Sequence, residues 1–186
     1  MAFDRAEVLK RIDSVSGVIE RHAGWAEQQG RLHDRALQAL VEAQVPRLFL
    51  PASLGGLEVD PVTCALACEK LAVADTAAAW HVMVFNVARL MAAQWPQALV
   101  ELLWADDPDT LVAASGHTPL QAVPQGDGYL ISGRQRFVSG CDHASWLLSP
   151  VLIDEIPAMA VMPLAECSIE QNWDTVSYTH LTLPTT

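Results

Sequence analysis

The sequence predicts an α+β protein, in which an N-terminal helical bundle is followed by an antiparallel β-barrel or sandwich. Two observations predict this fold class. Up to about residue 108, apolar residues recur mainly at helical spacing. From about 109 to 175, short apolar runs are separated by glycine and other turn residues, as in strands. We therefore expect two domains in contact, at 1–108 and 109–175.

Five helices are expected in the first domain. Apolar residues from Val8 to Ile19 recur at helical spacing and predict a first helix that ends near Gly24 or Gly30. A second helix should end before Pro46, because the residue preceding proline avoids helical geometry. Asp60 and Pro61 then form a helix start, with an N-cap followed by proline at the first helical position.

The fourth helix is the most apolar part of the chain. It runs from Thr76 to Trp95 and contains His81, Asn86 and Arg89, which would be costly inside a bilayer. We interpret it as a buried helix of the bundle rather than a membrane span. A short fifth helix is expected at 97–105.

Strands are expected at 111–114, 129–132, 135–139 and 146–153. The triplet at 126–128, Gly-Asp-Gly, is a strong hairpin signal, since these residues tolerate the positive backbone angles of tight turns.

Composition narrows the class of protein. The 186 residues are 51% hydrophobic, which is enough for a core. Lys and Arg number 11 against 22 Asp and Glu, and the net charge of -11 would repel a nucleic-acid backbone. The mixed charges of the first residues resemble neither a secretory signal nor a transit peptide, so a cytoplasmic protein is expected.

The four cysteines do not form a metal-binding pattern. Cys64 and Cys68 are spaced to share a helix face rather than to form a CxxC clip, and we expect reduced cysteines and no metal site. Walker, HExxH, EF-hand, nucleophile-elbow and Gly-x-Gly-x-x-Gly motifs are all missing from the sequence.

The most specific motif is Ser139-Gly140-Cys141-Asp142-His143-Ala144-x-Trp146. Together with Leu54-Gly55-Gly56-Leu57-Glu58 and Ala79-Trp80, it resembles the acyl-CoA dehydrogenase superfamily, and within it the two-component (group D) flavin-dependent aromatic monooxygenases. The resemblance covers about residues 30–175 and departs from the branch at Gln135, where an aromatic residue is usual.

This resemblance implies a C-terminally truncated chain, which lacks the C-terminal four-helix domain of the fold. The last residues, 176–186, depart from the family and resemble translated sequencing-adapter read-through, so we expect them to be a non-native tail. The full-length protein is expected to be a homotetramer. The fragment alone, with one wall of the flavin site, is expected to be inactive.

A cofactor site is expected on the β segment. A flavin ring is apolar on its faces and polar along one edge, so it needs strand edges and hydroxyl or amide donors. Strand alternation would place Gln135, Phe137 and Ser139 on one face, and Gly140 would let a ring approach the backbone. With the resemblance, the flavin (FAD or FMN) contacts are Ser115, Phe137, Ser139 and Gly140. From periodicity alone, Phe137 is better interpreted as sheet core and Ser139-Gly140 as a turn that ends a strand.

The fourth helix supplies the expected substrate pocket. In the related fold this segment borders the flavin and substrate cavity, which makes candidates of Trp80, His81, Phe85 and Asn86. Polar residues of a buried helix are, however, often satisfied by neighbouring helices. No catalytic residue is assigned, and His143 is interpreted as a structural turn residue.

Three functions stay open. The resemblance implies a monooxygenase that uses O2 and reduced flavin from a partner reductase to hydroxylate an aromatic or heteroaromatic small molecule through a flavin hydroperoxide. The alternative is an acyl-CoA dehydrogenase that oxidises the α,β bond of a thioester with FAD, which is disfavoured because the Thr-Glu-Pro and Gly-Ser-Asp signals of that group are missing. The third is a non-enzymatic scaffold with an acidic surface.

Overall fold

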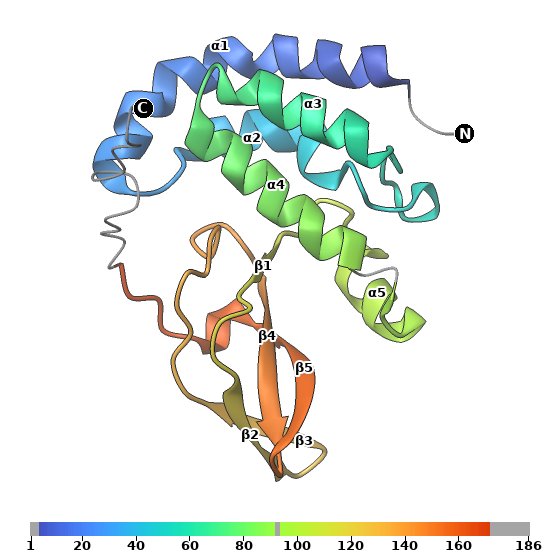
Figure 1. Cartoon of the computed structure of the whole chain (residues 1–186), viewed down its shortest axis with the longest axis vertical. Helices are drawn as coiled ribbons and strands as arrows, with labels where there is room; N and C mark the ends of the chain where they lie inside the picture. The colour runs from blue at the N-terminus through green and yellow to red at the C-terminus, as the bar shows by residue number, and fades with distance from the viewer. Residues whose placement is uncertain (1–3, 92–93, 172–186) are drawn as a thin grey trace, which may run out of the picture.

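A layer of helices adjoins a single sheet in the computed structural model, which describes residues 4–91 and 94–171 (Figure 1). The α+β class is therefore confirmed. The expected tail at 176–186 lies outside the described residues.

The helices of the described chain precede its strands, apart from the short η4 (Leu164–Glu166), which follows the last strand. They are α1 (Arg5–Gln29), α2 (Asp34–Glu42), η1 (Val45–Arg47), η2 (Ala52–Leu54), α3 (Pro61–Ala72), α4 (Thr76–Met91) and α5 (Gln97–Trp104). Within the described residues, no helix is both long and apolar enough to cross a bilayer.

The expected helix ends are confirmed by their local chemistry. Asp60 caps α3, since its carboxylate accepts from the backbone N–H of Thr63 at 3.0 Å. Gly30 ends α1 in the left-handed region, with φ of 68°. Of the two glycines considered for that end, Gly24 lies inside the helix.

The sheet is built around β4 (Trp146–Ile153). This strand pairs in parallel with β1 (Val112–Ala114) and β2 (Leu120–Gln125), and antiparallel with β5 (Ile156–Pro163). The hairpin partner of β2 is β3 (Gly128–Ser132). The sheet is thus mixed, and the expectation of a purely antiparallel one is corrected, because β1 and β2 reach β4 by crossovers rather than hairpins.

One expected strand is wrong. The segment from Gly133 to Val138 forms neither a helix nor a strand, so alternation does not place Gln135, Phe137 and Ser139 on one face. Phe137 itself has φ of 57°, which a strand residue does not adopt. The sequence pattern did not indicate β5, and it gave no bounds for β2.

A shared core joins the two layers. It packs α4 and α5 against β1 and β4, and its buried members are Leu50, Ala88, Val100, Leu103, Trp104, Val112 and Leu148. In Figure 1, α4 runs obliquely above β1, and the two elements are in contact. This contact holds the helix that carries the expected pocket residues beside the sheet, whose connecting segments carry the expected cofactor residues.

A buried arginine also stabilises the contact between the helices and the sheet. Arg89 of α4 is 1% exposed and donates to the backbone carbonyls of Phe85, Pro108 and Thr110 at 3.1, 3.2 and 2.9 Å. Its guanidinium also lies 5.6 Å from the Trp104 ring. Burial lowers the pKa of Arg89 to about 10. This value is still well above neutral pH, so the guanidinium stays charged.

Candidate functional site

Two expected residues from different layers meet directly. The indole N–H of Trp80 on α4 donates to Ser139 Oγ at 3.0 Å, across 59 positions of sequence. The contact forms part of the junction between α4 and the turn at 139–144. Because Trp80 is 47% exposed, this contact lies on the solvent-exposed side of the junction. The structure therefore places an expected pocket residue against an expected flavin contact.

Gly140 is the point where the turn meets α4. Its φ is 80°, and a β-carbon there would lie 2.6 Å from Phe85 Cε1 and 3.6 Å from His81 Cδ2. The expected reason for this glycine was the approach of a flavin ring to the backbone. In the described chain, the ring that makes the close approach belongs to Phe85, which is 1% exposed.

Phe137 lies in the segment that leads into this turn, and its side chain is 53% exposed. Its left-handed backbone is uncommon for an aromatic residue, and such strain concentrates at functional sites. The ring centroid of Phe137 is 5.6 Å from that of His117. His117 was not among the residues expected from the sequence. No local pattern indicates it, because the loop after β1 brings it to Phe137.

The irregular segment leaves backbone donors available. Because residues 133–138 pair with no strand, the N–H groups of Val138 and Ser139 donate to no acceptor in the described part of the chain. The hydroxyl hydrogen of Ser139 also has no acceptor among those residues, since its Oγ takes part only as acceptor to Trp80. Unused donors of this kind suit a ligand with a polar edge.

Ser115 lies under the segment rather than at its open side. It is 6% exposed, and its hydroxyl lies 3.0 Å from Gln135 Oε1 and 2.9 Å from the carbonyl of Arg136. Gln135 in turn donates to Ser149 Oγ at 2.7 Å. This buried network fixes the backbone that leads to Phe137, which gives Gln135, the departure from the family pattern, a structural role.

Two histidines flank the turn. The ring centroids of His81 and His143 are 6.3 Å apart, and the buried Nε2 of His143 has no hydrogen-bond partner in the described chain. His81 Nδ1 lies 2.8 Å from the carbonyl of Ala77, which assigns the proton to Nδ1 and leaves Nε2 as the acceptor.

Both histidines are held towards the neutral form. Burial lowers the pKa of His81. Burial, and then the neighbouring His81, lower the pKa of His143, while Asp142 and Asp34 oppose the shift and Arg31 adds to it.

Asn86 differs from the other pocket candidates. It is fully buried, and its amide donates to the carbonyls of Val45 and Val82 at 3.0 and 2.8 Å. Its oxygen accepts from the N–H of Phe49 at 3.1 Å. All these partners are backbone groups of the helical layer, so the structure does not bring Asn86 to the junction.

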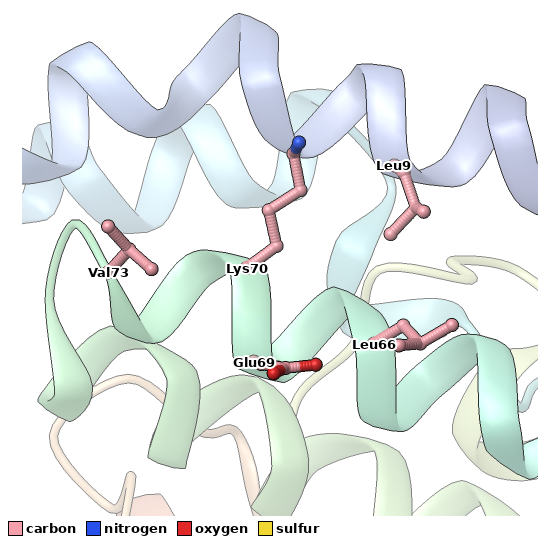
Figure 2. A pocket seen from close by; sticks show the side chains of 5 residues that line it. All are labelled: Leu9, Leu66, Glu69, Lys70 and Val73. Atoms are coloured by element: carbon pink, nitrogen blue, oxygen red, sulfur yellow. The ribbon is translucent and has the colours of Figure 1, made fainter.

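The described chain also has a shallow hollow elsewhere, of about 320 Å³ (Figure 2). It lies between α1 and α3 and is lined by Leu9, Leu66, Glu69, Lys70 and Val73. Lys70 Nζ is 2.8 Å from Asp13, so its charge is already paired. None of the expected site residues lines this hollow. The described residues also contain no cluster of three or more side chains suited to hold a metal ion.

Known proteins resemble this chain over most of its length. No protein-family model matches it. The HsaA oxygenase subunit of a flavin-dependent monooxygenase from Mycobacterium tuberculosis H37Rv is 32% identical over 176 residues, or 91% of this chain and 44% of the relative. An indole-3-acetate monooxygenase from Acinetobacter baumannii is 30% identical over 83% of this chain and 41% of its own length. The chain thus spans less than half the length of these relatives.

Solved structures agree with the sequence comparison. XiaF from Streptomyces, in a complex with FADH2 and glycerol, has a TM-score of 0.87 and 25% identity over 92% of this chain and 45% of XiaF. The HsaA monooxygenase of M. tuberculosis has a TM-score of 0.84 and 29% identity over 93% of this chain and 49% of its own. By sequence and by fold, the chain resembles the oxygenase subunits of two-component flavin-dependent monooxygenases, which have an acyl-CoA dehydrogenase-like fold.

Proposed function

We propose that this chain forms part of an oxygenase that uses reduced flavin and O2 to hydroxylate an aromatic or heteroaromatic small molecule. The observation that carries the proposal is the junction at which Trp80 and Phe85 of α4 meet Ser139 and Gly140 of the turn. The relatives named above are oxygenases, which favours this reaction over the alternative acyl-CoA dehydrogenase.

The residues at the junction fit a flavin. Half-exposed aromatic rings at Trp80 and Phe137 offer apolar surface to a flat ring system. The Ser139 hydroxyl and the N–H groups of Val138 and Ser139 offer donors for its polar edge. When bound, a reduced flavin supplies the electrons that activate O2.

Each expected cofactor residue then has a distinct part. Phe137 and Ser139 touch the flavin, and Gly140 allows the turn to lie on α4. Ser115 supports them through its bonds to Gln135 and Arg136. The chain's own contribution is to bind and orient the flavin and to keep water from one side of it.

His81 is the pocket residue with a chemically available atom. Its Nε2 is free to accept a proton from a phenolic or indolic substrate, and its lowered pKa keeps it neutral for that role. Reduced flavin would come from a separate reductase, since the relatives include an oxygenase component named as FADH2-dependent. We also propose that the full-length protein is cytoplasmic and forms a homotetramer. Analytical ultracentrifugation of the full-length protein tests the tetramer.

The assay uses the complete polypeptide that contains this chain, because the half-exposed side chains at the junction leave a flavin open to water. The protein is mixed with reduced FMN or FAD, then with ¹⁸O2 and a panel of phenolic and indolic acids. We expect a hydroxylated product that carries one ¹⁸O atom. Unlabelled product, or reduction of bound FAD by an acyl-CoA without oxygen transfer, would contradict the proposal.

A further inference from the structure

The contact between Trp80 and Ser139 has a direction that follows from the chemistry of the two groups. An indole N–H is a donor only, whereas a serine hydroxyl has one hydrogen and two acceptor lone pairs. Since the N–H of Trp80 lies 3.0 Å from Ser139 Oγ, it occupies one lone pair of that oxygen. The hydrogen of the hydroxyl must then point away from the indole.

That hydrogen has no protein acceptor in the described parts of the chain, and the hydroxyl is only partly buried. A serine hydroxyl without the Trp80 contact would rotate between its staggered positions and would spend part of the time aimed at α4. With the contact, one orientation is favoured before any ligand arrives. Preorganisation of this kind reduces the cost of binding.

The remaining contacts hold the two partners in place. Gly140, the next residue after Ser139, lies against the buried ring of Phe85 on the same helix as Trp80. The turn is also closed by bonds from the N–H groups of His143 and Ala144 to the carbonyl of Gly140, both at 3.1 Å. The distance between the indole and the hydroxyl is therefore set by the packing of the turn on α4.

Resting on the proposed function, we infer that Trp80 is a positioning residue, whose N–H fixes the Ser139 oxygen as an acceptor and so directs the Ser139 hydrogen towards a bound flavin. This gives the helix a role in cofactor binding that is separate from lining a substrate pocket. Trp80 acts through Ser139 and requires no ring contact of its own for this effect.

The first test follows the contact without any flavin. The indole ¹H–¹⁵N resonance of Trp80 is assigned by its loss in Trp80→Phe, and is then compared between the wild-type chain, Ser139→Ala and Ser139→Thr. We expect Ser139→Ala to move this resonance upfield and to speed its exchange with solvent, and Ser139→Thr to restore it. An unchanged resonance in Ser139→Ala would overturn the inference.

The second test measures flavin binding in a double-mutant cycle. Oxidised FMN is titrated into the wild-type chain, Trp80→Phe, Ser139→Ala and the double variant, with binding followed by NMR into the millimolar range. We expect each single change to weaken binding about 3- to 10-fold, and the double change to weaken it no more than Ser139→Ala alone. Trp25→Phe, a tryptophan of α1 outside the junction, serves as the matched control and should leave binding unchanged.

Two outcomes separate the inference from the function on which it rests. If Ser139→Ala weakens FMN binding but Trp80→Phe does not, Trp80 has no positioning role, while the proposed function stands. If the indole responds to Ser139→Ala but the wild-type chain shows no FMN binding at the junction, both the flavin-directed role and the proposed function fail, and the contact is structural.

Discussion

Gly140 lies so close to Phe85 that a β-carbon at position 140 would come within 2.6 Å of the Phe85 ring. This relationship explains why a glycine stands in the most specific motif of the sequence: it allows the turn at 139–144 to rest on α4. The rest of the candidate site depends on that contact, because it brings Ser139 to Trp80.

The first prediction concerns this contact. Gly140→Ala should lower the free energy of unfolding by about 2–4 kcal/mol, because it combines a left-handed backbone with overpacking against a buried ring. Urea denaturation measures the change. Gly24→Ala, where a β-carbon meets no atom within 4 Å inside α1, should instead be neutral or stabilising. A loss below about 1 kcal/mol for Gly140→Ala would mean that the turn does not rest on Phe85 as described.

The second prediction separates Asn86 from the site. Asn86→Leu should cost about 2–4 kcal/mol of stability, since it removes the partner of the half-buried N–H of Phe49 and of the buried carbonyl of Val45. The flavin affinity of the folded Asn86→Leu protein should equal that of the wild type, once the unfolded fraction is taken into account. Gln38→Ala, which removes a single exposed bond to Glu42, is the control and should cost little. A specific loss of flavin or substrate affinity in folded Asn86→Leu would return Asn86 to the pocket.

The third prediction tests how the two layers are joined. Arg89→Met should lower stability by about 3 kcal/mol, because three backbone carbonyls lose a charged donor. We also expect the helices and the sheet to unfold less cooperatively, so that circular dichroism and tryptophan fluorescence give separate melting curves. Arg134→Met, which removes an exposed ion pair with Glu170, should leave a single transition. Coincident melting curves and unchanged stability in Arg89→Met would show that Arg89 does not join the helices to the sheet.

The fourth prediction concerns pH. Because burial lowers the pKa of His81 and of His143 in the folded protein, the unfolded chain takes up protons first as the pH falls below about 6.5. Their contribution to stability is therefore complete above that pH and is lost as the pH falls towards the folded pKa values. The double variant His81→Gln, His143→Gln should show a shallower fall in unfolding free energy between pH 7.5 and 5.5. A double variant whose stability followed the wild type over this pH range would contradict the prediction.

Local signals were sufficient to predict the helices from sequence. The cap at Asp60 and the left-handed end at Gly30 depend on neighbours within a few residues, and both lie where the pattern predicts a helix end. The two strands without predicted bounds, β2 and β5, both contain proline, although β4 was predicted despite Pro150. Pro124 lies in β2 and Pro157 in β5, and proline in a run argues against a strand unless the pairing is known.

The sequence indicated candidate residues for the site but not their geometry. The family pattern pointed to Trp80 and Ser139, whereas their hydrogen bond joins positions 59 residues apart and follows from packing alone. The same long-range packing replaces the expected strand at 135–139 with an irregular segment, which is why alternation misplaced Gln135. Asn86 shows the converse, since its burial among backbone partners leaves no sequence signal.

The central claim is that the junction of α4 with the turn at 139–144 forms a flavin-binding wall, and mapping FMN and FAD onto this chain by NMR tests it most directly. Because Trp80 and Phe137 are about half exposed, we expect weak binding, with a dissociation constant well above the micromolar range. Chemical-shift changes should concentrate at the indole of Trp80 and at the amides of Phe137 to Gly140. The claim would be contradicted if the shifts instead clustered at the hollow around Lys70, or spread evenly over the chain at millimolar flavin.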